Sequence, residues 1–101
     1  MENQAAGRAD GEVRENPEKH RFELQIEGDA MALAYYAIED GQLVLTHTEV
    51  PSEYSGQGIA TRLAKGTFEL LRHSGRKAVL KCPFMGTFFA RHPEYADVVA
   101  G

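Results

Sequence analysis

The chain has 101 residues, a net charge of −4 and a hydrophobic fraction of 43%. This length favours a single small domain, and the negative charge argues against a protein that binds a nucleic acid backbone, because such proteins concentrate Lys and Arg. The single cysteine, Cys82, cannot form an intramolecular disulfide, and the cysteine and histidine spacings of a metal site do not occur. The sequence shows neither the roughly 20 apolar residues of a membrane span nor a signal-peptide core, so it predicts a cytoplasmic protein.

Residues 1–19 are polar and carry one Met and one Val as their sizeable apolar side chains. Such a segment buries too little apolar surface to offset the entropy that ordering it costs. We therefore expect a disordered tail over residues 1–19 and one folded domain over residues 20–101.

Three strands are predicted in the first half of that domain. Residues 20–27 alternate apolar and polar side chains, which is the pattern of a half-buried strand. The run 31–38 is nearly all apolar and fits a strand buried on both faces, and residues 42–50 form a third candidate. Turns at Gly28-Asp29 and Asp40-Gly41 would join them into an antiparallel meander.

The pattern changes period after Pro51, which ends the third strand because proline has no N–H to donate. From 58 to 73, apolar side chains recur every three or four residues and predict a helix with one broad apolar face. Within it, Gly66 costs about 1 kcal/mol relative to alanine, which suggests close packing against the sheet. Residues 78–82 predict a fourth strand, parallel to the third through a right-handed crossover, and 84–92 a second helix. The result is an α+β fold in the order β-β-β-α-β-α.

The loop between the third strand and the first helix carries the sharpest functional signal. Gly56 and Gly58 allow backbone N–H groups to converge at a helix N-terminus, where they can hold a phosphate or pyrophosphate. A tight turn needs the same glycines for steric reasons alone, so the alternative is a structural role. The loop lacks the Lys-Ser/Thr ending of a phosphate-binding loop, and it follows antiparallel strands, which disfavours a dinucleotide fold.

Two motifs in the right order make a family resemblance. The segment Val-Pro-Ser-Glu-Tyr-Ser-Gly-Gln-Gly-Ile-Ala at 50–60 resembles the signature of the Gcn5-related N-acetyltransferases, whose core pattern is Gln/Arg-x-x-Gly-x-Gly/Ala. Gly58 and Ala60 match that pattern, whereas Ser55 replaces the usual Gln or Arg. Glu-Val-Pro at 49–51, Cys-Pro-Phe at 82–84 and His-Pro-Glu-Tyr at 92–95 are similar to a group of very short, single-domain members.

The resemblance covers roughly residues 20–99 and implies a mixed sheet in which the third and fourth strands splay apart to hold acetyl-CoA or coenzyme A. It implies contacts with the cofactor through Glu49, Val50, Ser55, Gly56, Gln57, Gly58, Ile59 and Ala60. The implied activity is an acetyl-CoA-dependent transfer of an acyl group to an amine, on a small molecule or a protein, by a monomer or weak dimer. The alternative is a non-catalytic coenzyme A-binding sensor or interaction module.

Cys82, Glu49 and His47 are the candidate catalytic residues. Cys82 falls at the end of the fourth strand, where it could accept the acyl group, line the thioester pocket or pack in the core. In a regular strand, His47 and Glu49 share one face with Leu43 and Leu45, and either could take the proton of an ammonium acceptor. Alternatively, they pair with each other or face solvent. Tyr95 could donate a proton to the departing thiolate or act as a packing lid.

Overall fold

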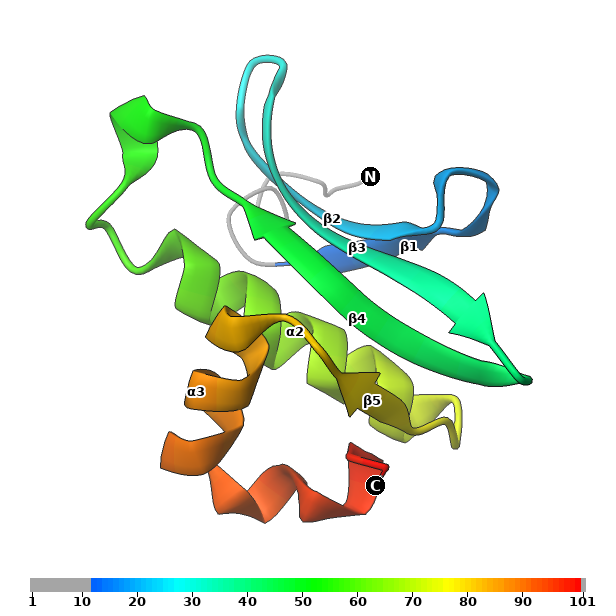
Figure 1. Ribbon diagram of the computed structural model, residues 1–101. Helices are drawn as coiled ribbons and strands as arrows, with labels where there is room; N and C mark the ends of the chain where they lie inside the picture. Colours follow the sequence, from blue (N-terminus) through cyan, green and yellow to red (C-terminus); the bar gives the residue numbers. More distant parts are fainter. Residues whose placement is uncertain (1–11, 101) are drawn as a thin grey trace.

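The computed structural model describes residues 12–100, which form a mixed five-stranded sheet in the order β1-β2-β3-β4-β5 (Figure 1). Neighbouring strands are antiparallel except β4 and β5, which are parallel. The strands are β1 (Val13–Asn16), β2 (Arg21–Glu27), β3 (Ala30–Glu39), β4 (Gln42–Glu49) and β5 (Ala78–Leu80). The α-helices are α2 (Ile59–His73) and α3 (Pro83–Arg91), and the 3-10 helices are η1 (Pro17–Lys19), η2 (Ser52–Tyr54) and η3 (Pro93–Val98). The predicted α+β class is confirmed.

The sequence predicted that the folded domain begins at residue 20, but in the structure the first strand, β1, already begins at Val13. Strand β1 pairs with β2, with Val13 opposite Leu24. Two contacts from other elements hold it: Val13 is 5% exposed and packs on Gly66 of α2, and Glu15 accepts a hydrogen bond from Arg76 Nη2 at 2.7 Å. The predicted disorder is therefore wrong for residues 13–19, because composition does not reveal these partners. Residues 1–11 lie outside the described part of the chain.

Strand β3 is buried on one face, whereas the sequence predicted a strand buried on both faces. Ala32, Ala34 and Tyr36 are buried, whereas the alternating residues between them are half-exposed. Helix α2 packs on β1, β2 and β3, and α3 packs on β4 and β5. The rings of Phe68 in α2 and Phe88 in α3 lie 5.4 Å apart, so both helices cover the same face. Within residues 12–100 the sheet thus has one face covered by helices and one face on which no helix lies, called the helix-free face below.

The hairpin between β3 and β4 has the geometry that its sequence predicts. Asp40 and Gly41 both have positive φ, 52° and 78°, and Glu39 pairs with Gln42. Two successive positive φ values are those of a type I′ turn, which matches the twist of the flanking strands. The predicted hairpin is confirmed.

Strands β4 and β5 pair over three residues and then separate. The last pair is Leu45 with Leu80, and the Leu45 carbonyl accepts hydrogen bonds from the N–H groups of Lys81 and Cys82, at 3.0 and 2.9 Å. Beyond this point β4 continues to Glu49, while the other chain turns into α3 at Pro83. The two strands therefore diverge as predicted, and the place beyond Leu45 where they separate is called the splay below. Strand β5 ends at residue 80 instead of 82, because Cys82 is the N-cap of α3.

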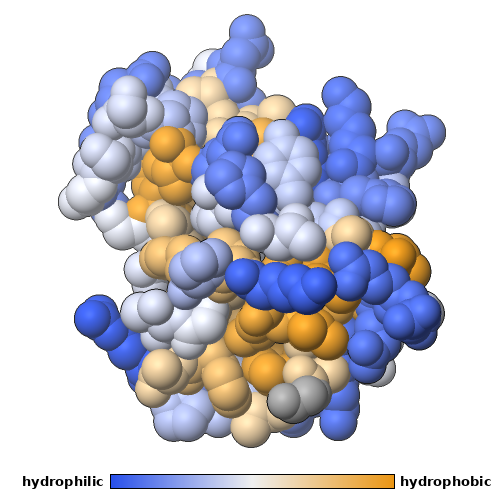
Figure 2. All heavy atoms as spheres, viewed as in Figure 1, coloured by the Kyte–Doolittle hydropathy of each residue, from blue (hydrophilic) through white to orange (hydrophobic). Residues whose placement is uncertain are grey.

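On the side of the molecule viewed in Figure 2, apolar surface gathers over β5 and the C-terminal segment.

Candidate functional site

The loop before α2 presents an uncapped helix N-terminus. Gly56 and Gly58 have φ values of 79° and 76°, and Gly58 is the N-cap of α2 without a side-chain hydrogen bond to the helix. The first turn of α2 carries no acidic residue. A Cβ at either glycine would meet no atom within 4 Å, so the requirement for glycine is conformational. The first N–H groups of the helix and its positive dipole end are therefore available to an anion.

The other residues of this loop offer a ligand their backbone groups more than their side chains. Ile59 is 4% exposed and its side chain belongs to the core, so its N–H is what it can offer to a ligand. The Ser55 hydroxyl donates a hydrogen bond to the Ser52 carbonyl oxygen at 2.9 Å, which turns it back into its own loop. Gln57 is exposed and Ala60 is half-buried. Arg62, one turn into α2, is also exposed.

A β-bulge at Thr46 changes which residues face the helices. Tyr35 pairs with His47 and Tyr36 with Leu45, which leaves Thr46 as the extra residue of β4. Because side chains alternate across a strand, one extra residue reverses the faces of everything beyond it. Thr48 therefore lies opposite the fully buried Ala34, on the helix-covered face.

His47 and Glu49 consequently lie on the helix-free face, and the prediction that they share a face with Leu43 and Leu45 is wrong. His47 Nε2 is 3.1 Å from Glu49 Oε2, and the two side chains are 59% and 55% exposed. The His47 ring also stacks on Tyr35, with centroids 6.1 Å apart. The alternative that the two residues pair with each other is what the structure shows. A carboxylate and an imidazole are thus joined beside the splay.

Cys82 lies on the other side of β4 from this pair. It is 4% exposed, and its Sγ is 3.2 Å from the Thr48 Oγ1. The structure thus brings Cys82 together with Thr48, which the sequence did not suggest, and separates it by the sheet from His47 and Glu49. Regular alternation along β4 predicted the wrong face for His47, Thr48 and Glu49, because a bulge has no marker in this sequence.

Tyr95 belongs to the core and not to the splay. It is 3% exposed, its hydroxyl donates a hydrogen bond to Glu69 at 2.9 Å, and its ring meets Phe68 edge-on. Burial, followed by the hydrogen bond to Glu69, raises the pKa of Tyr95 to about 12. This arrangement supports the packing role of Tyr95.

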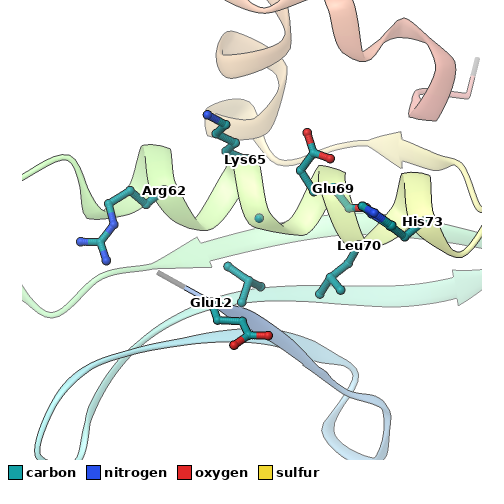
Figure 3. Close-up of a pocket in the computed structure, with 8 residues that line it drawn as sticks. Glu12, Arg62, Lys65, Glu69, Leu70 and His73 are labelled. Atoms are coloured by element: carbon teal, nitrogen blue, oxygen red, sulfur yellow. The ribbon is translucent and has the colours of Figure 1, made fainter. Parts of the chain in front are cut away.

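A separate groove of about 510 Å³ lies between β1 and α2 (Figure 3). Its lining residues are Glu12, Val13, Arg62, Lys65, Gly66, Glu69, Leu70 and His73. Neither glycine of the loop nor Cys82 is among them, so the groove is distinct from the splay.

Residues 12–100 contain neither a cluster of metal ligands nor a membrane-spanning helix. In this part of the chain, no group of three or more His, Cys, Asp or Glu side chains is placed to hold a metal ion. The helices described there are too short or too polar to cross a membrane.

Comparison with known proteins identifies the family. Residues 21–98 match the family model described as GCN5-related N-acetyl-transferase. Protein NATD1 of Danio rerio is 30% identical over 89 residues, which cover 84% of this chain and 81% of the relative. Protein NATD1 of Mus musculus is 30% identical, covering 80% and 76%, and that of Homo sapiens is 30% identical, covering 80% and 74%. With the splayed strands and the glycine loop, these matches show that the chain belongs to the GCN5-related N-acetyltransferase family.

Proposed function

We propose that this chain is an acetyl-CoA-dependent N-acetyltransferase. The observation that carries the proposal is the uncapped start of α2 at Gly58, at the end of the loop that follows β4, a strand that has separated from its parallel neighbour. The N–H groups of 56–60 would hold the pyrophosphate, because the Ser55 N–H already donates to the Ser52 carbonyl at 3.1 Å. The backbone of Glu49 and Val50 would pair with the pantetheine in the splay. The residues present fit this ligand, because the helix start offers amide donors and no acidic side chain in its first turn.

The proposed reaction transfers an acetyl group to an amine, on a small molecule or a protein. When bound, acetyl-CoA supplies the acetyl group as an activated thioester. The His47–Glu49 pair would take the proton of the ammonium acceptor, which must be neutral to attack. In direct transfer, the amine nitrogen bonds to the carbonyl carbon, the C–S bond breaks and coenzyme A leaves as the thiol after gaining a proton. In a relay, the Cys82 sulfur bonds to the carbonyl carbon, the C–S bond to coenzyme A breaks, and coenzyme A leaves as the thiol with the proton that Cys82 loses. The amine nitrogen then bonds to the same carbon, and Cys82 leaves and regains a proton.

A second candidate, a coenzyme A-binding sensor or interaction module, has its own support. Cys82 is buried, and His47 and Glu49 bind each other on the opposite side of β4. Cofactor binding without transfer is compatible with this arrangement. For either function we propose a cytoplasmic protein, in keeping with its single free cysteine, that is a monomer or weak dimer.

Binding is tested by thermal unfolding with increasing acetyl-CoA. We expect stabilisation that grows with ligand concentration and reaches about 2.7 kcal/mol at 100 times Kd. Gly58→Glu should abolish it by placing a carboxylate at the anion site. The matched control is Gly75→Glu, because Gly75 is exposed, has a φ of 71° and lies at the other end of α2. No stabilisation of the unaltered chain at millimolar ligand, or full stabilisation of Gly58→Glu, would contradict the proposed site.

Transfer is tested by measuring coenzyme A release and the intact mass of the protein with a panel of amines. Glu49→Gln should slow release by about 10²- to 10⁴-fold if Glu49 helps to remove the proton. An acetyl adduct that vanishes in Cys82→Ala supports the relay, whereas undiminished release in that variant supports direct transfer. Binding without release for every amine favours the sensor.

A further inference from the structure

Thr48 and Cys82 face each other across the point where β4 and β5 separate. Thr48 belongs to the part of β4 beyond its last pair with β5, and Cys82 follows β5 by two residues. Their Oγ1 and Sγ atoms, 3.2 Å apart, therefore join the two diverging chains. The contact depends on the bulge at Thr46, since regular alternation would turn Thr48 to the helix-free face.

The backbone of Cys82 is held on both sides. Its N–H donates to the Leu45 carbonyl at 2.9 Å, and its carbonyl accepts from the N–H of Gly86 at 3.1 Å. With the main chain held in this way, the remaining freedom of the thiol is rotation about its side-chain bond. The Thr48 hydroxyl is placed to decide that rotation.

We infer that Thr48 is a positioning residue for Cys82, whose hydroxyl orients the sulfur at the splay and donates a hydrogen bond to it when it acts as a nucleophile. This inference rests on the proposed function for its role in acyl transfer. A hydroxyl can accept from a thiol and donate to a thiolate by rotating its O–H, so one residue serves both forms of sulfur. The donated bond matters most for the thiolate, because hydrogen bonds to charged groups are stronger than neutral ones and a buried thiolate has little water around it.

The inference is tested on the reactivity of the sulfur alone. The chain has one cysteine, so alkylation by iodoacetamide, followed by intact mass, reports Cys82 directly. In that reaction the sulfur bonds to the CH₂ carbon, iodide leaves and the thiol proton passes to water. Two comparisons at position 48 isolate the hydroxyl: the unaltered Thr48 against Thr48→Val, and Thr48→Ser against Thr48→Ala. Thr87→Val, at an exposed position on α3, is the control.

We expect Thr48→Val to be alkylated about 10-fold more slowly than the unaltered chain, which corresponds to the loss of one hydrogen bond to a charged group. Thr48→Ser should retain a rate within about twofold, Thr48→Ala should be slower than Thr48→Ser, and Thr87→Val should be unchanged. Equal rates for Thr and Val, or for Ser and Ala, would overturn the inference, as would faster alkylation without the hydroxyl. If Thr48→Val does not fold, the Ser and Ala pair decides.

The same variants then report on acyl transfer. If Cys82 relays the acetyl group, adduct formation from acetyl-CoA should follow the same order as alkylation. Because iodoacetamide needs no cofactor, failure to bind acetyl-CoA would contradict the proposed function while leaving the alkylation result to decide the role of Thr48.

Discussion

At the scale of single residues, Thr46 shows how one position rearranges a site. As the extra residue of a bulge it turns Thr48 toward Cys82 and sends His47 and Glu49 to the helix-free face. Bulges often lie beside active sites, where they redirect a side chain. Here the bulge divides the candidate catalytic residues into two groups on opposite sides of β4.

Thr67 is a second residue with an unusual environment. It is fully buried on α2, and among the described residues its Oγ1 has no hydrogen-bond partner. A buried polar group without a partner costs about 1–3 kcal/mol, because its hydration is lost without replacement.

Thr67→Val is therefore expected to stabilise the protein by about 1 kcal/mol or more, since valine has nearly the same shape without the hydroxyl. Urea unfolding measures the change in free energy. Thr87→Val, at an exposed position, should have little effect. A loss of stability in Thr67→Val would show that the hydroxyl has a partner in solution.

At the scale of elements, strand β1 is attached by two unlike contacts. Its apolar contact is Val13 against the bare backbone of Gly66 in α2. Its polar contact is Glu15, which accepts hydrogen bonds from Arg76 Nη2 at 2.7 Å and from the Tyr36 hydroxyl at 2.5 Å. Together these contacts explain why a short polar strand is ordered.

Gly66→Ala should weaken the attachment of β1. The added Cβ would lie 2.2 Å from Val13 Cγ2, so the strand or the helix must move. Overpacking of this kind typically costs about 1–3 kcal/mol, against a gain of about 1 kcal/mol in helix propensity. Gly86→Ala on α3, where a Cβ meets nothing within 4 Å, is the control and should be neutral or stabilising. Equal gains in urea unfolding for both variants would refute close packing at Gly66.

Glu15 should make stability depend on acidity. The hydrogen bond from Arg76 is the largest influence on its pKa, which is lowered from 4.5 despite partial burial. A carboxyl with a lowered pKa in the folded state stabilises the protein above its unfolded pKa, and this contribution is lost as the pH falls through the folded value.

We therefore expect the stability advantage of the unaltered chain over Glu15→Gln to be largest near pH 6 and to shrink as the pH falls below 4.5. Urea unfolding at several pH values measures it. Glu18→Gln, at an exposed position in η1, should follow the pH dependence of the unaltered chain. A constant difference between the unaltered chain and Glu15→Gln would contradict the role of the carboxylate.

At the scale of the whole molecule, the fold has two layers, with α2, α3 and η3 over one face of the sheet. Aromatic contacts among Phe68, Phe88 and Tyr95 join these three segments. Arg72 adds a clamp from α2 to η3, because its Nη2 donates to Asp97 at 2.6 Å while its guanidinium lies over the Tyr95 ring. The C-terminal segment is thereby part of the core.

Alkaline conditions should destabilise this core through two buried tyrosines. Burial is the first cause that raises the pKa values of Tyr36 and Tyr95 to about 12, above the ordinary 10.0. A raised pKa in the folded state contributes stability below the unfolded pKa and loses it as the pH rises. The free energy of unfolding should therefore decline between pH 10 and 12. Tyr95→Phe should reduce that decline, and an unchanged slope in this variant would exclude Tyr95 as a cause.

Local pattern was sufficient to predict much of this protein. The helical period from 58 to 73 and the Asp40-Gly41 turn both appear where expected, because they depend on nearby residues. The glycines at 56 and 58 also have the positive φ values that favour glycine. The predicted fold class, the loop before α2 and the splay after Leu45 follow from such patterns and from the family resemblance.

Tertiary structure alone decided the neighbours of the candidate catalytic residues and the place of β1. Thr48 and Cys82 are 34 residues apart in the sequence, and Glu15 and Arg76 are 61 apart. The bulge at Thr46 depends on how β4 pairs with β3. The burial of Val13 depends on the absence of a side chain at Gly66 of α2. Residue periodicity describes one segment at a time, whereas these contacts arise from the register and packing of segments that meet only in the folded chain.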